Sequence, residues 1–143
     1  MNTDFSAQRP SALPLAITCG DPAGVGPEII ARWLETYPAE RARVAVIGPA
    51  SWLETLPCEV AAKVAVGDTG FGATPGQPGE AGARVARDAM EHAAAGCLAG
   101  AYSGVVTGPV SKAWLARVGY PYPGQTEFFA ARWGKEGGGG GDA

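Results

Sequence analysis

Several residue types are scarce in this sequence of 143 residues, and each shortage excludes a class of protein. The single histidine, His92, cannot by itself build the three-ligand site of a catalytic zinc enzyme. The cysteines are odd in number, far apart and outside any C-x-x-C motif; they are Cys19, Cys58 and Cys97. This pattern predicts reduced thiols in a cytoplasmic protein. No apolar run reaches the roughly 18 residues of a membrane helix, so no membrane association is expected.

Charge is also sparse, because only 17% of the residues are charged and the net charge is −3. The 11 basic residues are scattered, which predicts no nucleic-acid partner. Residues 1–12 are polar and mixed, and we expect them to be a disordered N-terminus without the apolar segment of a signal peptide. A chain of this length with 46% apolar residues can form one domain with a real core.

Glycine is abundant, and the segment ITCGDPAGVGPEII at residues 17–30 is the most informative of the glycine-rich stretches. A short apolar run precedes it, and apolar residues at helical spacing follow over residues 27–37, so the pattern predicts strand, loop and helix. The loop-forming residues are Gly20, Asp21, Gly24 and Gly26. The spacing matches neither G-x-G-x-x-G nor a P-loop. Backbone N–H groups near a helix start suit an anion, whereas Asp21 would repel one, so a ligand loop and a plain turn both stay open.

The rest of the chain alternates between strand-like and helix-like segments. Strands are predicted at residues 44–47, 63–66 and 104–107, and helices at residues 50–56, 80–98, 112–118 and 125–133. Residues 67–79 are almost all turn formers and predict a long loop. Ser111 and Thr126 are the expected N-caps of the last two helices. The alternation indicates an α/β domain over residues 13–133 with a largely parallel sheet covered by helices.

Residues 134–143 depart from this pattern, because they contain five consecutive glycines and almost nothing apolar. We expect this glycine-rich tail to be disordered. An α/β domain that passes so abruptly into low complexity indicates a chain cut short, for example by a frame change in GC-rich coding sequence.

Three segments resemble the PdxA family of 4-hydroxythreonine-4-phosphate dehydrogenases of vitamin B6 biosynthesis. They read TCGDPAGVGPEII (residues 18–30), VVTGPVSKAWL (residues 105–115) and YPGQTEFFA (residues 122–130). Their order and spacing agree with the N-terminal part of the family, and the resemblance covers nearly all of residues 13–133. It implies a three-layer α/β/α fold like that of the isocitrate and isopropylmalate dehydrogenases, truncated in this chain.

The resemblance also implies an activity, namely NAD(P)-dependent oxidation of 4-phosphooxy-L-threonine followed by decarboxylation, as a step towards pyridoxal phosphate. Family members are cytoplasmic homodimers that act on this phosphorylated small molecule. They hold a divalent metal (Zn, Mg or Co) with three histidines, all of which lie further along the family chain than residue 143. We therefore expect no metal ligand within this chain, and most phosphate and cofactor contacts are expected to be missing as well.

The resemblance identifies candidate substrate-binding residues. Gln125 stands where the family motif G-H-T-E has histidine, and glutamine cannot titrate near neutral pH. Thr126 is the best candidate contact, with helix capping as the other interpretation. Lys112 matches the family motif T-G-P-x-x-K and could meet an anionic group or be a solvated helix lysine. Asp21 could orient a substrate amine or cap its loop, and Glu127 is interpreted as a structural first-turn acid. No catalytic residue is assigned.

Three interpretations of the chain stay open at this point. It is an incomplete dehydrogenase, a non-catalytic module that binds a small anion or pairs with a family member, or a fragment without function.

Overall fold

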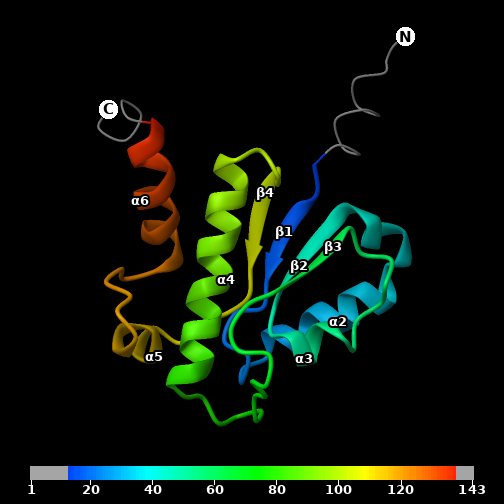
Figure 1. Cartoon of the computed structure of the whole chain (residues 1–143), viewed down its shortest axis with the longest axis horizontal. Helices are drawn as coiled ribbons and strands as arrows, with labels where there is room; N and C mark the ends of the chain where they lie inside the picture. The colour runs from blue at the N-terminus through cyan, green and yellow to red at the C-terminus, as the bar shows by residue number, and fades with distance from the viewer. Residues whose placement is uncertain (1–12, 138–143) are drawn as a thin grey trace.

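The computed structural model describes residues 13–137 and contains a four-stranded, fully parallel sheet (Figure 1). The strands are β1 (Leu15–Thr18), β2 (Val44–Gly48), β3 (Ala62–Ala65) and β4 (Gly104–Thr107). Their order across the sheet is β3-β2-β1-β4, so β1 and β2 are central. The predicted α/β class with a parallel sheet is therefore confirmed, and each predicted strand lies within two residues of its observed position.

The helices are α2 (Gly26–Thr36), the 3₁₀ helix η1 (Pro38–Arg43), α3 (Ala50–Leu53), α4 (Glu80–Leu98), α5 (Lys112–Arg117) and α6 (Gln125–Gly137). Helix α3 is shorter than predicted, and η1 was not predicted at all. The predicted N-cap role of Thr126 is wrong, since α6 begins one residue earlier. The Gly124 carbonyl accepts the Phe128 N–H at 3.3 Å, and glycine is well tolerated at a helix start.

Helix α2 covers one face of the sheet. Its Ile30 and Leu34 are buried against the strand residues Ile17, Val44 and Val46. These strand residues point to one face because neighbouring residues in a strand alternate between faces. Ala16 and Ile47 point to the opposite face, where they meet Val85, Ala89 and Ala93 of α4. Apart from Thr18 at the end of β1, the central strands are apolar because both of their faces are covered.

Helix α4 is buried on two sides. Besides the sheet, it packs against α5 and α6 (Figure 1). Ala86, Met90 and Ala94 of α4 share a buried cluster there with Leu115 and Phe128. The alanines let these helices approach closely, which accounts for the alanine-rich sequence of α4. Helices therefore cover both faces of the sheet, and α4 links the sheet to the helix pair that carries the end of the described chain.

The predicted ends of the domain are only partly within the described residues. Helix α6 continues to Gly137, so the prediction that disorder begins at residue 134 is wrong for residues 134–137. The remaining tail, residues 138–143, and the predicted disordered N-terminus, residues 1–12, lie outside the described residues. Within residues 13–137, none of the helices combines the length and apolar character needed to cross a membrane.

Candidate functional site

Two loops far apart in the sequence lie side by side at the carboxyl ends of β1 and β4. The Gly108 N–H donates to the Thr18 carbonyl at 2.9 Å, and the Asp21 N–H donates to the Pro109 carbonyl at 2.8 Å. Ligands of open parallel sheets bind in the crevice outside the carboxyl ends of the strands. The segments TCGDPAGVG and VVTGP thus meet at the end of the sheet where a site is expected.

The glycines of the first loop are required by this close approach. Gly20 has φ +73°, and a Cβ added there would lie 2.6 Å from the carbonyl carbon of Gly108. A Cβ on Gly26 would overlap the carbonyl oxygen of Cys19. A left-handed φ strains any residue with a side chain, and neither position has room for one. These two glycines therefore serve contacts between backbones within the fold.

Asp21 caps this loop. Its side chain is 6% exposed, and its Oδ1 accepts the Ala23 N–H at 2.9 Å. The Gly24 N–H donates to the Asp21 carbonyl at 2.9 Å. The N–H groups of Asp21, Ala23 and Gly24 are thus all engaged within the protein, beside a carboxylate. The loop-capping interpretation of Asp21 is confirmed, and these three N–H groups are not free to bind a phosphate.

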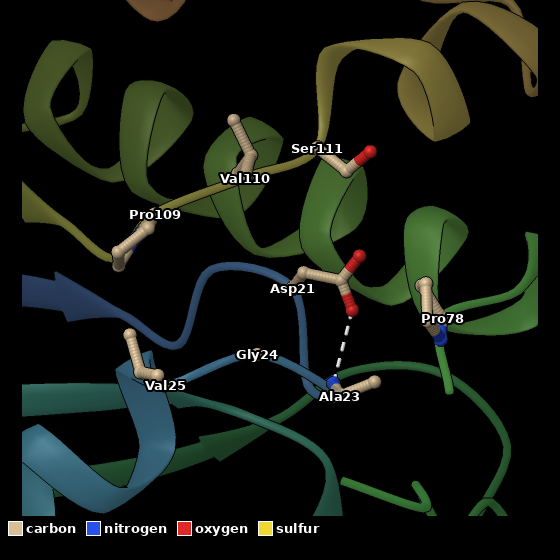
Figure 2. Close-up of a pocket in the computed structure, with 8 residues that line it drawn as sticks. All are labelled: Asp21, Ala23, Gly24, Val25, Pro78, Pro109, Val110 and Ser111. Carbon is tan, nitrogen blue, oxygen red and sulfur yellow. Dashed lines mark hydrogen bonds between the residues drawn. The ribbon is translucent and has the colours of Figure 1, made fainter. Parts of the chain in front are cut away.

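A pocket of about 320 Å³ opens beside this loop (Figure 2). The second oxygen of Asp21 points away from Ala23, towards the side of the pocket where Ser111 lies. The Ser111 hydroxyl accepts the Trp114 N–H at 3.3 Å, so the predicted cap of α5 is confirmed. The rest of the lining is mainly apolar and includes Val25, Pro78, Pro109 and Val110. Among the described residues, Asp21 is the only charged one that lines this pocket.

A second pocket, of about 430 Å³, lies at the start of α6 and is lined by Thr107, Gln125, Thr126, Phe129 and Trp133, among others. The Gln125 side-chain Nε2 donates to the Gly108 carbonyl at 3.3 Å. Its Oε1 is buried and accepts no hydrogen bond from the residues that the structure describes. Thr126 is exposed at the mouth. Gln125 and Thr126 are thus brought together beside the end of β4.

Lys112 is separate from both pockets. It is exposed at the first position of α5, lines neither pocket, and makes no ion pair within the described part of the chain. Glu127 is likewise exposed, in the first turn of α6. The candidates therefore fall into two adjacent groups, Asp21 at one pocket and Gln125 with Thr126 at the other.

Two threonines at this end of the sheet were not among the sequence candidates. Thr18 and Thr107 end β1 and β4 and are paired in register. Thr18 is 1% exposed, and its hydroxyl has no hydrogen-bond partner among the described residues. Thr107 lines the pocket that contains Gln125. The available signal was a polar residue that closes an otherwise apolar strand of a parallel sheet.

Cys19 lies directly after β1 and is fully buried. Burial raises the pKa of its thiol to about 12, and the nearby Asp21 carboxylate acts in the same direction. Its Sγ donates to the Gly20 carbonyl at 3.1 Å. The thiolate is the reactive form of cysteine, so Cys19 is a packing residue here.

The three thiols should therefore react with iodoacetamide at very different rates in the folded protein. At pH 8 we expect exposed Cys58 to be alkylated first and Cys97, whose pKa burial also raises, more slowly. Cys19 should be protected until urea unfolds the chain. Peptide mass spectrometry after timed quenching measures all three, and alkylation of Cys19 as fast as that of Cys58 would contradict the burial described above.

The single histidine, His92, and the acidic residues do not form a metal site within the described residues. No three of the His, Cys, Asp and Glu side chains in residues 13–137 come together. The Nε2 atom of His92 instead hydrogen-bonds the Tyr102 hydroxyl at 2.7 Å. The described residues thus do not fit a divalent metal bound by this chain alone.

The sequence and the fold both match known proteins. A family model described as "Pyridoxal phosphate biosynthetic protein PdxA" matches residues 25–138. The 4-hydroxythreonine-4-phosphate dehydrogenase of Zymomonas mobilis is 38% identical over 138 residues, and that of Erythrobacter litoralis is 39% identical over 139 residues. These matches cover 85% and 82% of this chain, respectively, and 41% of each relative.

Solved structures of 4-hydroxythreonine-4-phosphate dehydrogenases share the fold. The enzyme from Klebsiella pneumoniae superposes with a TM-score of 0.70 at 30% identity, over 84% of this chain and 44% of that one. The enzyme from Burkholderia phymatum gives a TM-score of 0.70 at 26% identity, over 85% and 44%. This chain thus spans less than half the length of the relatives that it matches.

Proposed function

The chain belongs to the PdxA family, and from that premise we propose that it carries part of the active site of an NAD(P)-dependent 4-hydroxythreonine-4-phosphate dehydrogenase. The reaction would oxidise the hydroxyl of 4-phosphooxy-L-threonine and remove its carboxyl group. The observation that supports this most is the family match over residues 25–138. The proposal includes an isocitrate dehydrogenase-like α/β/α fold for the whole family protein.

Within this chain, the proposed substrate-binding side chains are Gln125 and Thr126. Both line the pocket at the first turn of α6, where the positive end of the helix dipole favours an anionic group. The Thr126 hydroxyl is exposed and free to donate to a substrate oxygen. Lys112 is proposed only as a long-range positive charge, because it lines neither pocket.

The residue at position 125 would determine the catalytic efficiency of the part of the active site that this chain carries. Its Nε2 is held by the Gly108 carbonyl, which fixes the side chain against the end of β4. A glutamine there can donate and accept hydrogen bonds, but it cannot exchange a proton near neutral pH. We therefore propose that Gln125 binds substrate and performs no acid–base step.

The nicotinamide and the metal belong to the proposal only for the whole family protein. A nicotinamide cofactor would accept the hydride removed from the substrate. In the loop at residues 19–25, the N–H groups of Asp21, Ala23 and Gly24 are engaged within the protein and the Asp21 carboxylate is negative, which disfavours binding of the cofactor's phosphates there. The described residues also do not fit a divalent metal. A cytoplasmic homodimer is proposed on the family resemblance alone.

A hybrid enzyme tests this proposal. Residues 13–133 of this chain replace the matching part of the Zymomonas mobilis relative, and formation of reduced cofactor is measured with 4-phosphooxy-L-threonine. We expect turnover by the hybrid and none by the 143-residue chain alone. Gln125→His in the hybrid should raise kcat/KM at least about tenfold if the ring supplies acid–base catalysis that glutamine cannot.

The matched control is Glu127→Gln, which alters an exposed residue in the same helical turn outside the pocket, and it should leave kcat/KM unchanged. Circular dichroism establishes that each hybrid is folded. A folded hybrid without turnover, with or without histidine at position 125, would overturn the proposal that these residues form a working half site. Robust turnover by the isolated chain would overturn the proposal that it holds only part of the site.

Small-anion binding without catalysis is a second candidate function, favoured by the accessible pocket at the start of α6. The probe is inorganic phosphate, added to the 143-residue chain in a thermal shift series. Stabilisation that is lost in Thr126→Val would support it, and an unchanged Tm across the series would exclude it.

A further inference from the structure

Two polar atoms are buried without a hydrogen-bond partner at the carboxyl end of the sheet. They are the Thr18 hydroxyl oxygen and the Gln125 side-chain oxygen, Oε1, and within residues 13–137 no other buried side-chain nitrogen or oxygen lacks a partner. The large majority of buried polar atoms in proteins are hydrogen-bonded, because an unpaired one loses its contacts with water and gains nothing in return. These two atoms therefore need an explanation.

The two residues lie on the same side of the sheet, beside Gly108. Thr18 follows Ile17, which faces α2, so the Thr18 side chain points to the opposite face, towards α4. Thr107 is in register with Thr18 and lines the pocket of Gln125. The Gly108 N–H donates to the Thr18 carbonyl at 2.9 Å, and the Gly108 carbonyl accepts from Gln125 Nε2 at 3.3 Å. Gly108 thus contacts both residues.

The two unpaired atoms are chemically complementary. The Gly108 carbonyl can only accept, so the nitrogen of the Gln125 amide faces it and Oε1 is turned into the protein. Oε1 needs a donor, and the Thr18 hydroxyl can both donate and accept. No hydrogen bond joins them directly. A water molecule can donate to the amide oxygen while it accepts from the hydroxyl, which is how buried waters commonly join polar groups.

We propose that one buried water molecule joins the Thr18 hydroxyl to Gln125 Oε1, and that Thr18 is thereby a positioning residue for Gln125. The amide is then held at both ends, by the water at Oε1 and by the Gly108 carbonyl at Nε2. The second Nε2 hydrogen remains for the pocket at the start of α6. This inference rests on the proposed substrate-binding role of Gln125, which it extends to a residue that does not line that pocket.

A glutamine held in this way determines the kind of group that the pocket selects. It presents a hydrogen-bond donor and no acceptor, and the exposed Thr126 hydroxyl beside it can donate as well. The matching ligand group is an acceptor, such as a phosphate or carboxylate oxygen. Without the Thr18 hydroxyl, the amide loses one of its two attachments, and Oε1 can turn towards the pocket and repel an anionic oxygen.

Urea denaturation of the full 143-residue chain tests the bridge without any substrate. Thr18→Val removes the hydroxyl and keeps the shape of the side chain. A bridged hydroxyl predicts a lower urea midpoint for Thr18→Val, whereas loss of an unpaired hydroxyl predicts an unchanged or higher one. Gln125→Met removes the other end of the bridge. In that background, Thr18→Val should lower the midpoint by less than half as much, because the two residues are coupled.

Thr36→Val is the matched control for this cycle. The Thr36 hydroxyl is exposed at the end of α2 and donates to the Arg32 carbonyl at 2.8 Å. The substitution also replaces a threonine by valine, but at a site far from the bridge in the fold. Its effect on the midpoint should be the same with Gln125 and with methionine at that position.

The mobility of the Gln125 amide separates positioning from a merely structural role. Its order parameter is measured by ¹⁵N relaxation of the side-chain NH₂ group, with the exposed Gln77 as the mobile comparison. The Gln125 value should exceed that of Gln77 in the wild type and fall towards it in Thr18→Val. Thr18→Ser keeps a hydroxyl and should restore the wild-type value.

The hybrid enzyme described above adds a kinetic measurement. Thr18→Val in the hybrid should raise KM at least about fivefold and change kcat less than about twofold, the pattern of a lost binding contact. Thr18→Ser should leave both near the values of the unmodified hybrid. A folded hybrid without turnover would overturn the proposed function, while the urea cycle and the amide order parameter would still decide the role of Thr18.

Three results would overturn the inference. They are equal effects of Thr18→Val with Gln125 and with methionine at that position, an amide order parameter unchanged by Thr18→Val, and a fall in kcat at constant KM. If Thr18→Val does not fold, the wild-type chain decides, since a Gln125 amide as mobile as that of Gln77 is not held at both ends.

Discussion

Replacing Phe128 by alanine should lower the free energy of unfolding by about 3–5 kcal/mol, the usual cost of deleting a buried phenylalanine ring. Phe128 is 1% exposed and lies among Tyr120, Tyr122 and Phe129, with ring centroids 5.6, 5.6 and 4.9 Å away. The Arg132 guanidinium lies 4.6 Å from its ring centroid. Deletion of this ring would leave a cavity where α6 is fixed to the rest of the protein.

Urea denaturation followed by tryptophan fluorescence measures this loss. Tyr37→Ala is the control, because Tyr37 is an aromatic residue that is 52% exposed, and its replacement should cost less than about 1 kcal/mol. Phe128→Ala should also displace the first turn of α6 and, with it, Gln125 and Thr126. If the Phe128→Ala protein is as stable as the Tyr37→Ala protein, the aromatic cluster does not hold this helix in place.

Gly20→Ala should be comparably damaging, for a different reason. A left-handed φ costs a residue with a side chain about 1–2 kcal/mol, and forcing an atom into a packed site adds about 1–3 kcal/mol. The atoms that a Cβ would meet are backbone atoms of Gly108 and Pro109, which cannot rotate away. The free energy of unfolding should therefore fall by about 2–5 kcal/mol, measured by the same urea experiment.

Gly100→Ala separates the two costs. Gly100 has φ +83°, close to the φ of Gly20, but an added Cβ there would meet nothing within 4 Å. Gly100→Ala should lower the free energy of unfolding only by the cost of the left-handed φ, about 1–2 kcal/mol. The difference between the two variants measures how tightly the loops at residues 19–25 and 108–109 are packed. Equal losses would show that the close approach at Gly20 contributes nothing to stability.

The fold was predictable from the sequence where local signals were strong. Uninterrupted apolar runs such as Val44–Gly48 are typical of buried parallel strands, and the alanine-rich segment Glu80–Leu98 is typical of a helix covered on two sides. The 3₁₀ helix η1 was missed because it has no buried residue, and periodicity detects only buried faces. Thr126 was wrongly assigned as a cap because a favourable capping residue was given more weight than the glycine that precedes the helix.

The candidate site was predictable in its parts and not in its arrangement. The sequence identified Asp21 and Gln125, but nothing in it indicates that the backbone of residues 108 and 109 lies between their pockets. It also could not show that the loop glycines serve packing, since glycine is equally suited to a phosphate cradle and to a tight contact. The threonine pair, Thr18 and Thr107, depends on strand order, which is a property of the whole sheet.

The pairing of β1 with β4 also determines when this end of the molecule can form. Ser103 donates from its backbone N–H to the Pro14 carbonyl, and the two residues are 89 positions apart. Contacts between distant segments form slowly, because the intervening chain must first lose much of its freedom. During synthesis, β1, α2 and β2 can assemble as soon as they emerge, whereas the crevice at the carboxyl ends of β1 and β4 cannot form until residues 104–109 have been made. A ribosome stalled within α4 would therefore carry a partly folded sheet with no site.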